Sequence, residues 1–149
     1  MRWNELKGEA CPVARGLSVV GDRWTMLVLR DCFRGVRRFD DFQRRLGITR
    51  HVLADRLRKL EEAGVLERRL YQERPPRHEY RLTEKGLALH PVLVTLVAWA
   101  ERWEPKAGAA SRLVSRATGE PVEPVLVDAL SGERLTHRSF AAPSPDRGA

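Results

Sequence analysis

The sequence predicts a mainly α-helical fold that carries one small β-hairpin, an α+β class. Apolar residues recur at helical spacing in segments that end at Gly35, Gly47 and Gly64. Two strand-like runs then flank a proline-containing loop, and a last helical stretch extends to Trp103. A short helix, a glycine turn, a capped helix and a hairpin, in this order, form a winged helix-turn-helix.

Length and composition favour one packed domain with a small appendage. The chain has 149 residues, of which 42% are hydrophobic and 32% charged, so it can bury a core. No apolar run approaches the ~18 residues of a membrane span, and residues 1–13 lack the apolar block of a secretory signal. Two cysteines are too few for a disulfide scaffold, so we expect a cytoplasmic protein with no membrane partner.

The positive charge lies in the first part of the chain. Residues 1–90 carry 20 basic and 13 acidic side chains, whereas residues 91–149 carry seven of each. The net charge of +7 therefore belongs to the first segment, and 23 of the 27 basic residues are arginine. A localised arginine excess attracts phosphate groups, in nucleic acid or on an anionic membrane.

The first two helices are expected at residues 12–20 and 22–34. Pro12 suits a first helical position because its missing N–H costs nothing there. Asp22 can cap the second helix, which leaves little polar surface and should therefore lie in the core.

The next segment carries the helix-turn-helix. A short helix is expected at 39–46, with acidic residues in its first turn and arginines in its last, as the helix dipole favours. Gly47 can adopt the left-handed conformation of a turn, and Thr49 can cap a second helix that runs to Ala63. The inward face of that helix is formed by Leu53, Leu57 and Leu60.

Strands are expected at 65–71 and 78–82, joined by an exposed loop whose two prolines exclude helix and ladder pairing. Thr83 can cap the last helix, which Pro91 should kink or break before Trp103. This helix carries more apolar surface than a small domain can cover, which makes it a candidate dimer interface.

Three regions are expected along the chain. Residues 10–103 form the packed domain, residues 104–140 a small extension with a hairpin and no metal, and residues 141–149 a disordered tail. No internal repeat or low-complexity block is found.

An ordered set of residues is shared with a known family. The matching positions are Cys11-Pro12, Gly21, Trp24, Arg38-Phe39, Leu53, Arg56-Leu57, Leu60-Glu61, Gly64, Pro75-Pro76, Glu79-Tyr80, Leu82-Thr83-Glu84, Gly86, Pro91 and Trp99. On these residues the chain resembles the HxlR-type winged-helix transcriptional regulators. The resemblance implies a homodimer, paired through its N-terminal and last helices, that binds palindromic operators on double-stranded DNA, often as a repressor. The interface residues expected on those helices are Val13, Leu17, Leu93, Leu96, Trp99 and Trp103.

The C-terminal region resembles the cysteine ribbon that many of these regulators carry. Thr118-Gly119 and Ser131-Gly132 stand where that ribbon has Cys-Gly knuckles, so the glycine turns are kept and soft zinc ligands are missing. We therefore expect a hairpin without metal.

The helix after Thr49 is predicted to read base edges in the major groove. With the leucine face inward, His51, Asp55 and Arg58 point outward. An arginine can pair with guanine, and Thr49 or Ala54 can contact a thymine methyl group. The alternative is an ordinary solvated helix face, and the acidic Asp55 argues against purely electrostatic binding. The DNA-binding candidates on this helix are Thr49, Arg50, His51, Ala54, Asp55 and Arg58.

Further arginines are predicted to contact DNA beside this helix. Arg74 and Arg77 lie at the tip of the hairpin, where winged proteins often insert an arginine into the minor groove. The candidates for phosphate contacts next to the major groove are Arg38, Arg44 and Arg45. An ordinary charged loop is the alternative for the hairpin tip.

Cys11 is a candidate redox sensor. At the N-cap of the first helix its thiol would lie beside the positive end of the helix dipole, which favours the thiolate. The resemblance implies that some relatives use the matching cysteine to sense oxidants or electrophiles, whereas a small buried hydrophobe is the alternative. Cys32 lies among apolar neighbours and is expected to be inert.

No enzyme activity, cofactor or metal is expected. The four histidines show no ligand spacing, and the sequence contains no nucleophile elbow, phosphate-binding glycine loop or zinc-protease signature. The prediction is a dimeric DNA-binding regulator whose effector, a small molecule or an oxidant, the sequence does not name. A winged helix used for protein–protein contact is the alternative, and an RNA-binding winged helix is a third.

Overall fold

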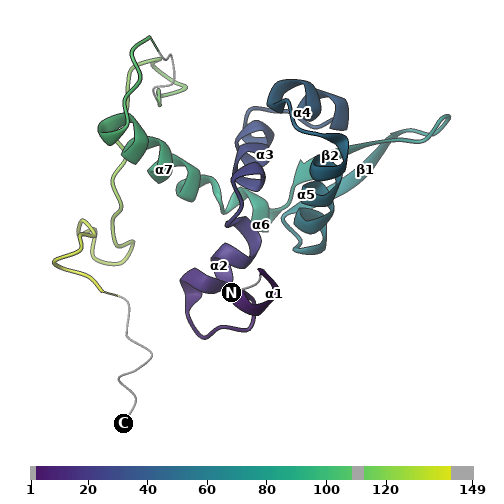
Figure 1. Cartoon of the computed structure of the whole chain (residues 1–149). Helices are drawn as coiled ribbons and strands as arrows, with labels where there is room; N and C mark the ends of the chain where they lie inside the picture. The colour runs from purple at the N-terminus through teal and green to yellow at the C-terminus, as the bar shows by residue number, and fades with distance from the viewer. Residues whose placement is uncertain (1–2, 109–112, 142–149) are drawn as a thin grey trace. The chain divides into compact units, whose positions relative to one another are not determined.

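A computed structural model describes residues 3–108 and 113–141 (Figure 1). The chain divides into two compact units, residues 1–90 and 91–149, and each is described by itself. The elements in chain order are α1 (Trp3–Leu6), α2 (Pro12–Val20), α3 (Arg23–Phe33), α4 (Phe39–Leu46), α5 (Arg50–Glu62), β1 (Leu66–Gln72), β2 (Arg77–Leu82), α6 (Glu84–Leu87) and α7 (His90–Trp103). The mainly α-helical fold with one hairpin confirms the predicted fold class, and α1 is an addition to it.

Side-chain caps fix where α3, α5 and α6 begin. The carboxylate of Asp22 accepts a hydrogen bond from the backbone N–H of Trp24 (3.0 Å), as predicted for the N-cap of α3. The hydroxyl groups of Thr49 and Thr83 cap α5 and α6 in the same way. The last predicted helix is split into α6 and α7 just before Pro91, because proline cannot donate the N–H that a continuous helix needs.

The helix-turn-helix has the predicted boundaries. α4 ends at Gly47, whose φ of 62° is left-handed, a conformation that glycine adopts without steric cost. Ile48 is buried under the turn, and Thr49 already caps α5. Figure 1 shows α3, α4 and α5 side by side, with the hairpin projecting from this group.

The core of the first unit lies between α3, α4, α5 and the start of β1. Its buried hydrophobic residues are Val28, Leu29, Phe42, Ile48, Leu53, Leu57, Leu60, Val65 and Leu66. The prediction that three leucines of α5 face inward is therefore confirmed. α2 has no buried residue and lies at the edge of this core.

Asp31 is a fully buried carboxylate on α3. It pairs with Arg30 on its own helix (3.0 Å) and with Arg45 on α4 (3.3 Å). Because a buried charge is costly unless it is paired, these arginines make the site tolerable and join α3 to α4.

Arg56 joins α5 to the start of α3. Its Nε donates to Asp22 Oδ1 (2.8 Å) and its Nη2 to Asp22 Oδ2 (3.3 Å). Partial burial raises the pKa of Asp22, but the hydrogen bonds from Arg56 and from the backbone of α3 outweigh it, so this pKa lies below its usual value. One carboxylate therefore both caps α3 and positions α5.

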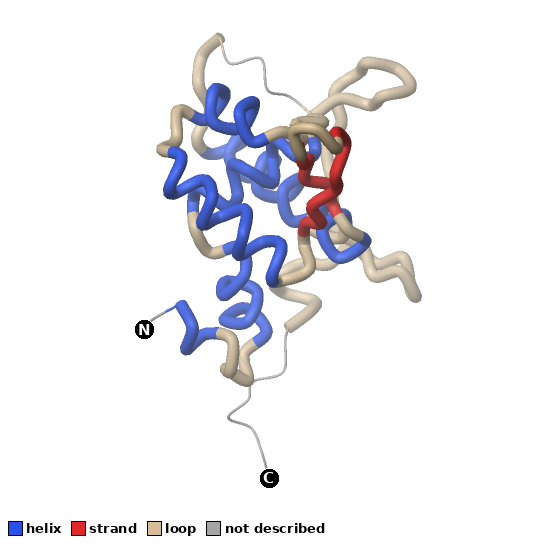
Figure 2. The backbone as a smooth tube through the Cα atoms, turned by 90° about the vertical axis from the view of Figure 1, so that its right-hand side faces the viewer, coloured by secondary structure: helices blue, strands red, loops and turns tan. Residues whose placement is uncertain are grey.

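The two strands form an antiparallel hairpin that starts with Leu66 opposite Leu82 (Figure 2). A bulge follows near the tip, and the connecting loop covers residues 73–76. The backbone N–H of Tyr80 donates to the carbonyl of Arg37 (2.7 Å). The hairpin is thereby anchored to the segment that precedes α4.

The second unit has no buried side chain within its described residues, 91–108 and 113–141. α7 leaves Leu96, Trp99 and Trp103 about half exposed or more (48%, 56% and 63%). Every helix in the described parts of the chain is too short or too polar to cross a membrane. The tail predicted at 141–149 lies outside the described residues, apart from Ala141.

The extension differs from the single hairpin that the sequence predicts. Residues 113–122 and 126–135 each form a tight turn, closed by one bridge, between Val114 and Pro121 in the first turn and between Val127 and Arg134 in the second. Pro121 at the end of the first turn and Pro124 between the turns lack the N–H that a ladder requires, so the two turns do not extend into one hairpin.

The two turns are an internal repeat, which corrects the expectation that the chain has none. Their glycines share a φ of 73°, and each glycine N–H donates to the carbonyl four residues earlier. Side-chain oxygens at the first repeat position accept backbone N–H groups of the same turn. The corresponding residues, offset by 13 positions, are Ser115, Thr118 and Gly119 in the first turn and Asp128, Ser131 and Gly132 in the second.

The substitution Gly86→Ala is expected to destabilise the first unit. A Cβ at this position would clash with the carbonyl oxygen of Val65, a backbone atom at the base of the hairpin. Overpacking of this kind costs about 1–3 kcal/mol, which urea denaturation of the full chain would measure. Gly16→Ala is the matched control: its Cβ meets nothing within 4 Å, and alanine should stabilise α2 by about 0.5–1 kcal/mol. A decrease in stability of the same size in both variants would contradict this packing.

The substitution Asp22→Asn is expected to lower the free energy of unfolding by about 1–2 kcal/mol at neutral pH, because it removes the charge that Arg56 binds. The pKa of Asp22 is lower in the folded chain than its ordinary value of 3.8. Its stabilisation is therefore complete above that value and is lost as the pH falls through the folded pKa. Urea denaturation at neutral pH and at about pH 3 should show the two chains converging at acid pH. A difference that does not change with pH would argue against the ion pair.

Candidate nucleic-acid interface

The outward face of α5 carries the side chains predicted to read DNA. His51, Ala54 and Arg58 are exposed on this face, and Asp55 is half-buried. The opposite face holds the buried leucines of the core. An exposed helix that directly follows a tight turn has the geometry of a recognition helix.

The start of α5 is held by two residues that are predicted to contact DNA. The hydroxyl of Thr49 accepts the backbone N–H of Val52 (3.4 Å). Arg50 donates to Asp40 on α4 (3.3 Å), and its guanidinium group lies over the ring of Phe39, 4.8 Å from the centroid. Both residues therefore contribute to the junction of α4 and α5.

Asp55 and Glu62 bind the cations of α5. Arg58 donates to Asp55 and to Glu62, each at 2.7 Å, and Lys59 lies 3.0 Å from Asp55. Partial burial raises the pKa of Asp55, but hydrogen bonds from Lys59 and Arg58 outweigh it and hold the pKa below its usual value. Asp55 is thus ionised on the face that is predicted to meet DNA.

Arg56 is a positioning residue that the sequence analysis did not assign. Besides Asp22 on α3 it contacts Asp55, 2.5 Å from its Nη1. Its place next to the buried leucine face was a usable signal, since a long charged side chain at the edge of a core commonly has an ion-pair partner.

Each arginine near α4 that is predicted to contact phosphate has an intramolecular partner. Arg44 pairs with Asp41 one turn earlier, and Arg45 pairs with the buried Asp31. The guanidinium of Arg38 lies over the ring of Tyr71 on β1, 4.4 Å from the centroid. These arginines help to hold α4 and the hairpin in place.

The hairpin tip differs from α4 and α5. Arg74 and Arg77 are exposed and have no ion pair within the described part of the chain. The side-chain amide of Gln72 donates to the carbonyl groups of Arg74 and Pro75 (3.2 and 3.3 Å), which orders the loop. The structure therefore brings two unneutralised cations to the tip of one hairpin.

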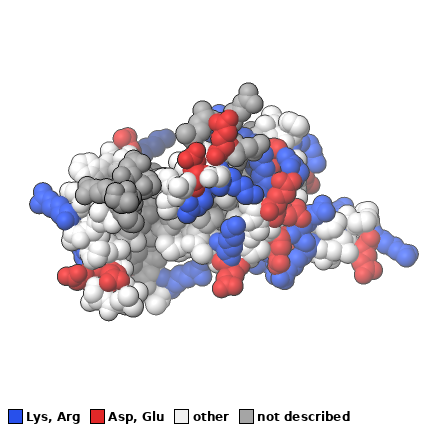
Figure 3. All heavy atoms as spheres, turned by 90° about the horizontal axis from the view of Figure 1, so that it is seen from below, with Lys and Arg blue, Asp and Glu red and all other residues white. Residues whose placement is uncertain are grey.

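Figure 3 views the chain from below. On the surface that it shows, acidic and basic side chains are interleaved and do not form one continuous basic field. Attraction to phosphate is therefore weaker on this face than the net charge of +7 alone would suggest.

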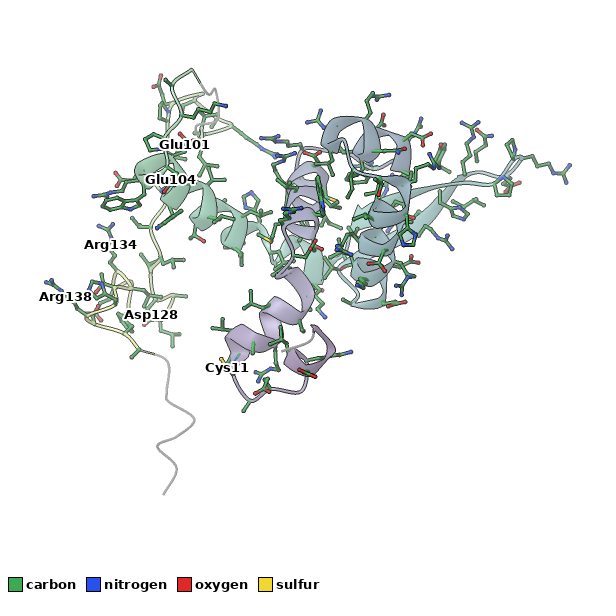
Figure 4. All side chains as sticks on the ribbon, in the orientation of Figure 1. Cys11, Glu101, Glu104, Asp128, Arg134 and Arg138 are labelled. Atoms are coloured by element: carbon green, nitrogen blue, oxygen red, sulfur yellow. The ribbon has the colours of Figure 1, made fainter. Side chains whose placement is uncertain are left out.

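Cys11 is exposed at the N-cap of α2, and Figure 4 labels it there. Its side chain makes no capping hydrogen bond. Arg15 donates instead to the carbonyl groups of Glu9 and Ala10 (3.0 and 2.5 Å), which orders the segment in front of the helix. Cys32 differs, because burial, with a smaller contribution from Asp31, raises the pKa of its thiol to about 12. Of the two thiols, Cys11 is exposed and Cys32 is only partly exposed.

The apolar residues predicted to form a dimer interface are largely exposed. Val13 and Leu17 on α2 are 69% and 45% exposed, and Leu93 on α7 is intermediate.

Within the described residues no three side chains of histidine, cysteine, aspartate or glutamate come together as a metal site. In the extension, the side-chain oxygens of Ser115, Thr118, Asp128 and Ser131 accept backbone N–H groups.

Solved and curated proteins share this architecture. An HTH-type transcriptional regulator of Mycobacterium tuberculosis, Rv3095, is 42% identical over 146 residues, which cover 97% of this chain and 90% of that protein. The crystal structure of PA1607, assigned as a transcription factor, aligns with a TM-score of 0.83 at 40% identity and covers 93% of this chain and 98% of that one. The redox regulator HypR in its reduced form aligns with a TM-score of 0.58 at 35% identity, over 62% of this chain and 92% of that one.

The family assignment follows from these likenesses. Residues 19–107 match the HxlR-like helix-turn-helix family, a segment that includes α3 to α7. The similar proteins are regulators of transcription and not enzymes, which confirms the predicted class. The chain is a transcriptional regulator of the helix-turn-helix type, and it belongs to the HxlR-like helix-turn-helix family.

Proposed function

We propose that this chain binds double-stranded DNA sequence-specifically as a homodimer and represses transcription from a palindromic operator. The observation that carries the proposal is the combination, in one compact unit, of an exposed recognition helix and a hairpin tip with two unneutralised arginines. The outward residues of α5 would enter the major groove, while Arg74 and Arg77 would reach the adjacent minor groove.

A second copy of the chain would cover the exposed apolar residues of α2 and α7. Trp99 and Trp103 on α7, and Val13 on α2, are each more than half exposed. Large apolar side chains exposed in this number favour an interface over free solvent. A dimer of this kind presents two recognition helices, so its half-sites would lie about one or two turns of DNA apart.

The double substitution Arg74→Ala/Arg77→Ala is expected to weaken DNA binding about tenfold and to flatten its salt dependence by about 0.9 in log–log slope for each phosphate that is no longer neutralised. Fluorescence anisotropy would measure binding of the full chain to duplexes from the DNA upstream of its own coding sequence, with random duplex and structured RNA as competitors. The wild-type chain should prefer its upstream duplex.

Arg138→Ala is the matched control, because it removes an exposed cation of the second unit. It should leave the affinity almost unchanged. An equal decrease in the control, or wild-type binding that ignores sequence, would contradict the proposal. Binding to no nucleic acid would favour a protein–protein module, and a preference for RNA would favour the RNA-binding alternative.

We further propose that oxidation of Cys11 modulates DNA binding. Support comes from its exposed thiol at a helix N-cap and from the structural likeness to a redox regulator. A change at Cys11 would act on α2. This helix contacts α3, which belongs to the core, and it carries the exposed Val13 and Leu17.

Diamide takes two electrons and two protons from a pair of thiols, and the exposed Cys11 of two copies of the chain can supply that pair. This disulfide is expected to release the wild-type chain from DNA, and Cys11→Ser should stay bound, because the serine cannot form the bond. Cys32→Ser is the control and should respond as the wild type does, since the Cys32 thiol is only partly exposed and its pKa is raised to about 12. The readout is anisotropy before and after diamide and after reduction. Release that persists in Cys11→Ser would rule out this sensor.

A further inference from the structure

Arg58 is the outward-facing arginine of α5, and both of its terminal nitrogens are engaged. Nη2 donates to Asp55 and Nη1 donates to Glu62, each at 2.7 Å. A guanine edge is read by two N–H groups of one guanidinium. These bonds use two of the five N–H groups of the guanidinium and orient it toward carboxylates of its own helix, so turning it onto a base edge costs at least one of them.

The charge of Asp55 has cationic partners other than Arg58. Lys59 lies 3.0 Å from its carboxylate, and Nη1 of Arg56 lies 2.5 Å from it. When Arg58 turns toward DNA, Asp55 keeps two cationic partners on the same helix. Glu62 would lose the partner that Arg58 provides, but its side chain is 61% exposed and stays solvated, so the exchange leaves no buried charge unpaired.

The loss of these hydrogen bonds is offset to different extents by two kinds of DNA contact. A guanine in the correct register offers two aligned and neutral acceptors, O6 and N7, which replace the hydrogen bonds that Arg58 gives up. A phosphate can also accept two N–H groups, but it carries a negative charge. The charges of Asp55 and Glu62 also repel it. The two carboxylates thus oppose contact at random sequence more strongly than contact at the correct bases.

We propose that Asp55 and Glu62 compete with DNA for the guanidinium group of Arg58, and that Asp55 is thereby a specificity-determining residue. It lowers affinity for random duplex DNA more than affinity for the operator. The proposal rests on the proposed function, and it adds a role that base contact alone does not give Asp55.

The test compares full-length wild type with Asp55→Asn on two probes. One is the duplex that the wild-type chain enriches most from a random library, and the other is a random duplex of the same length. Asp55→Asn should bind the random duplex about tenfold more tightly, with a salt dependence steeper by about one unit of log–log slope per protomer. Affinity for the enriched duplex should change less, so the ratio of the two affinities should fall.

Two further variants distinguish competition for Arg58 from a general effect of removing a negative charge and from a loss of folding. Glu62→Gln removes the other partner of Arg58 without touching Arg56, so it should change the ratio in the same direction even if Asp55→Asn were unstable. Glu61→Gln removes the same charge from the same helix, but Glu61 faces Arg68 of the hairpin, 3.9 Å away. It should shift both affinities by the same small factor.

The outcomes are distinguishable. An unchanged or increased ratio in both Asp55→Asn and Glu62→Gln would overturn this competition, and so would an equal fall of the ratio in Glu61→Gln. If the wild-type chain enriched no duplex at all, the proposed function would fail. The random-duplex measurement would still show whether the carboxylates restrain Arg58, since it needs no operator.

Discussion

The burial of one face of α5 is the constraint on which the rest of the molecule depends. Leu53, Leu57 and Leu60 are fully enclosed, which fixes the rotation of the helix about its axis and leaves the opposite face in solvent. Packing of α5 against α3, α4 and β1 then places the turn on one side of it and the hairpin on the other. The face on which the exposed side chains lie is thus set by what is buried behind them.

The charged side chains of α4 and α5 form ion pairs more than continuous patches of one sign. The arginines of α4 and α5 are engaged by Asp31, Asp40, Asp41, Asp55 and Glu62, so these arginines contribute to structure as well as to the surface potential. Exposed pairs of this kind contribute little to stability, usually below about 1 kcal/mol. Their larger effect is on geometry, since each carboxylate orients a guanidinium group before any ligand arrives.

Much of the fold could be predicted because its signals are local. Asp22, Gly47 and Thr49 mark helix ends by their own backbone chemistry, and the prolines of the hairpin loop exclude pairing wherever they occur. The pairing of Arg56 with Asp22 could not be predicted, because the partners lie 34 positions apart and meet only once α3 and α5 pack. The repeat in the extension was missed although Leu-Val and Gly-Glu recur 13 positions apart, because it is short and its acceptor changes from serine to aspartate, two residues with the same hydrogen-bonding role.

The oxygen-closed turns of the extension have a consequence for the chemistry of the whole chain. Hydroxyl and carboxylate groups hold these turns together, and such groups do not respond to mild oxidants or to reagents that alkylate sulfur. Of the two cysteines, Cys32 is only partly exposed and the pKa of its thiol is raised to about 12, so the thiol chemistry of the protein is expected to centre on Cys11, at the N-cap of α2. The extension should keep its shape in the same conditions that modify the N-terminal helix, so the two ends of this chain are chemically independent.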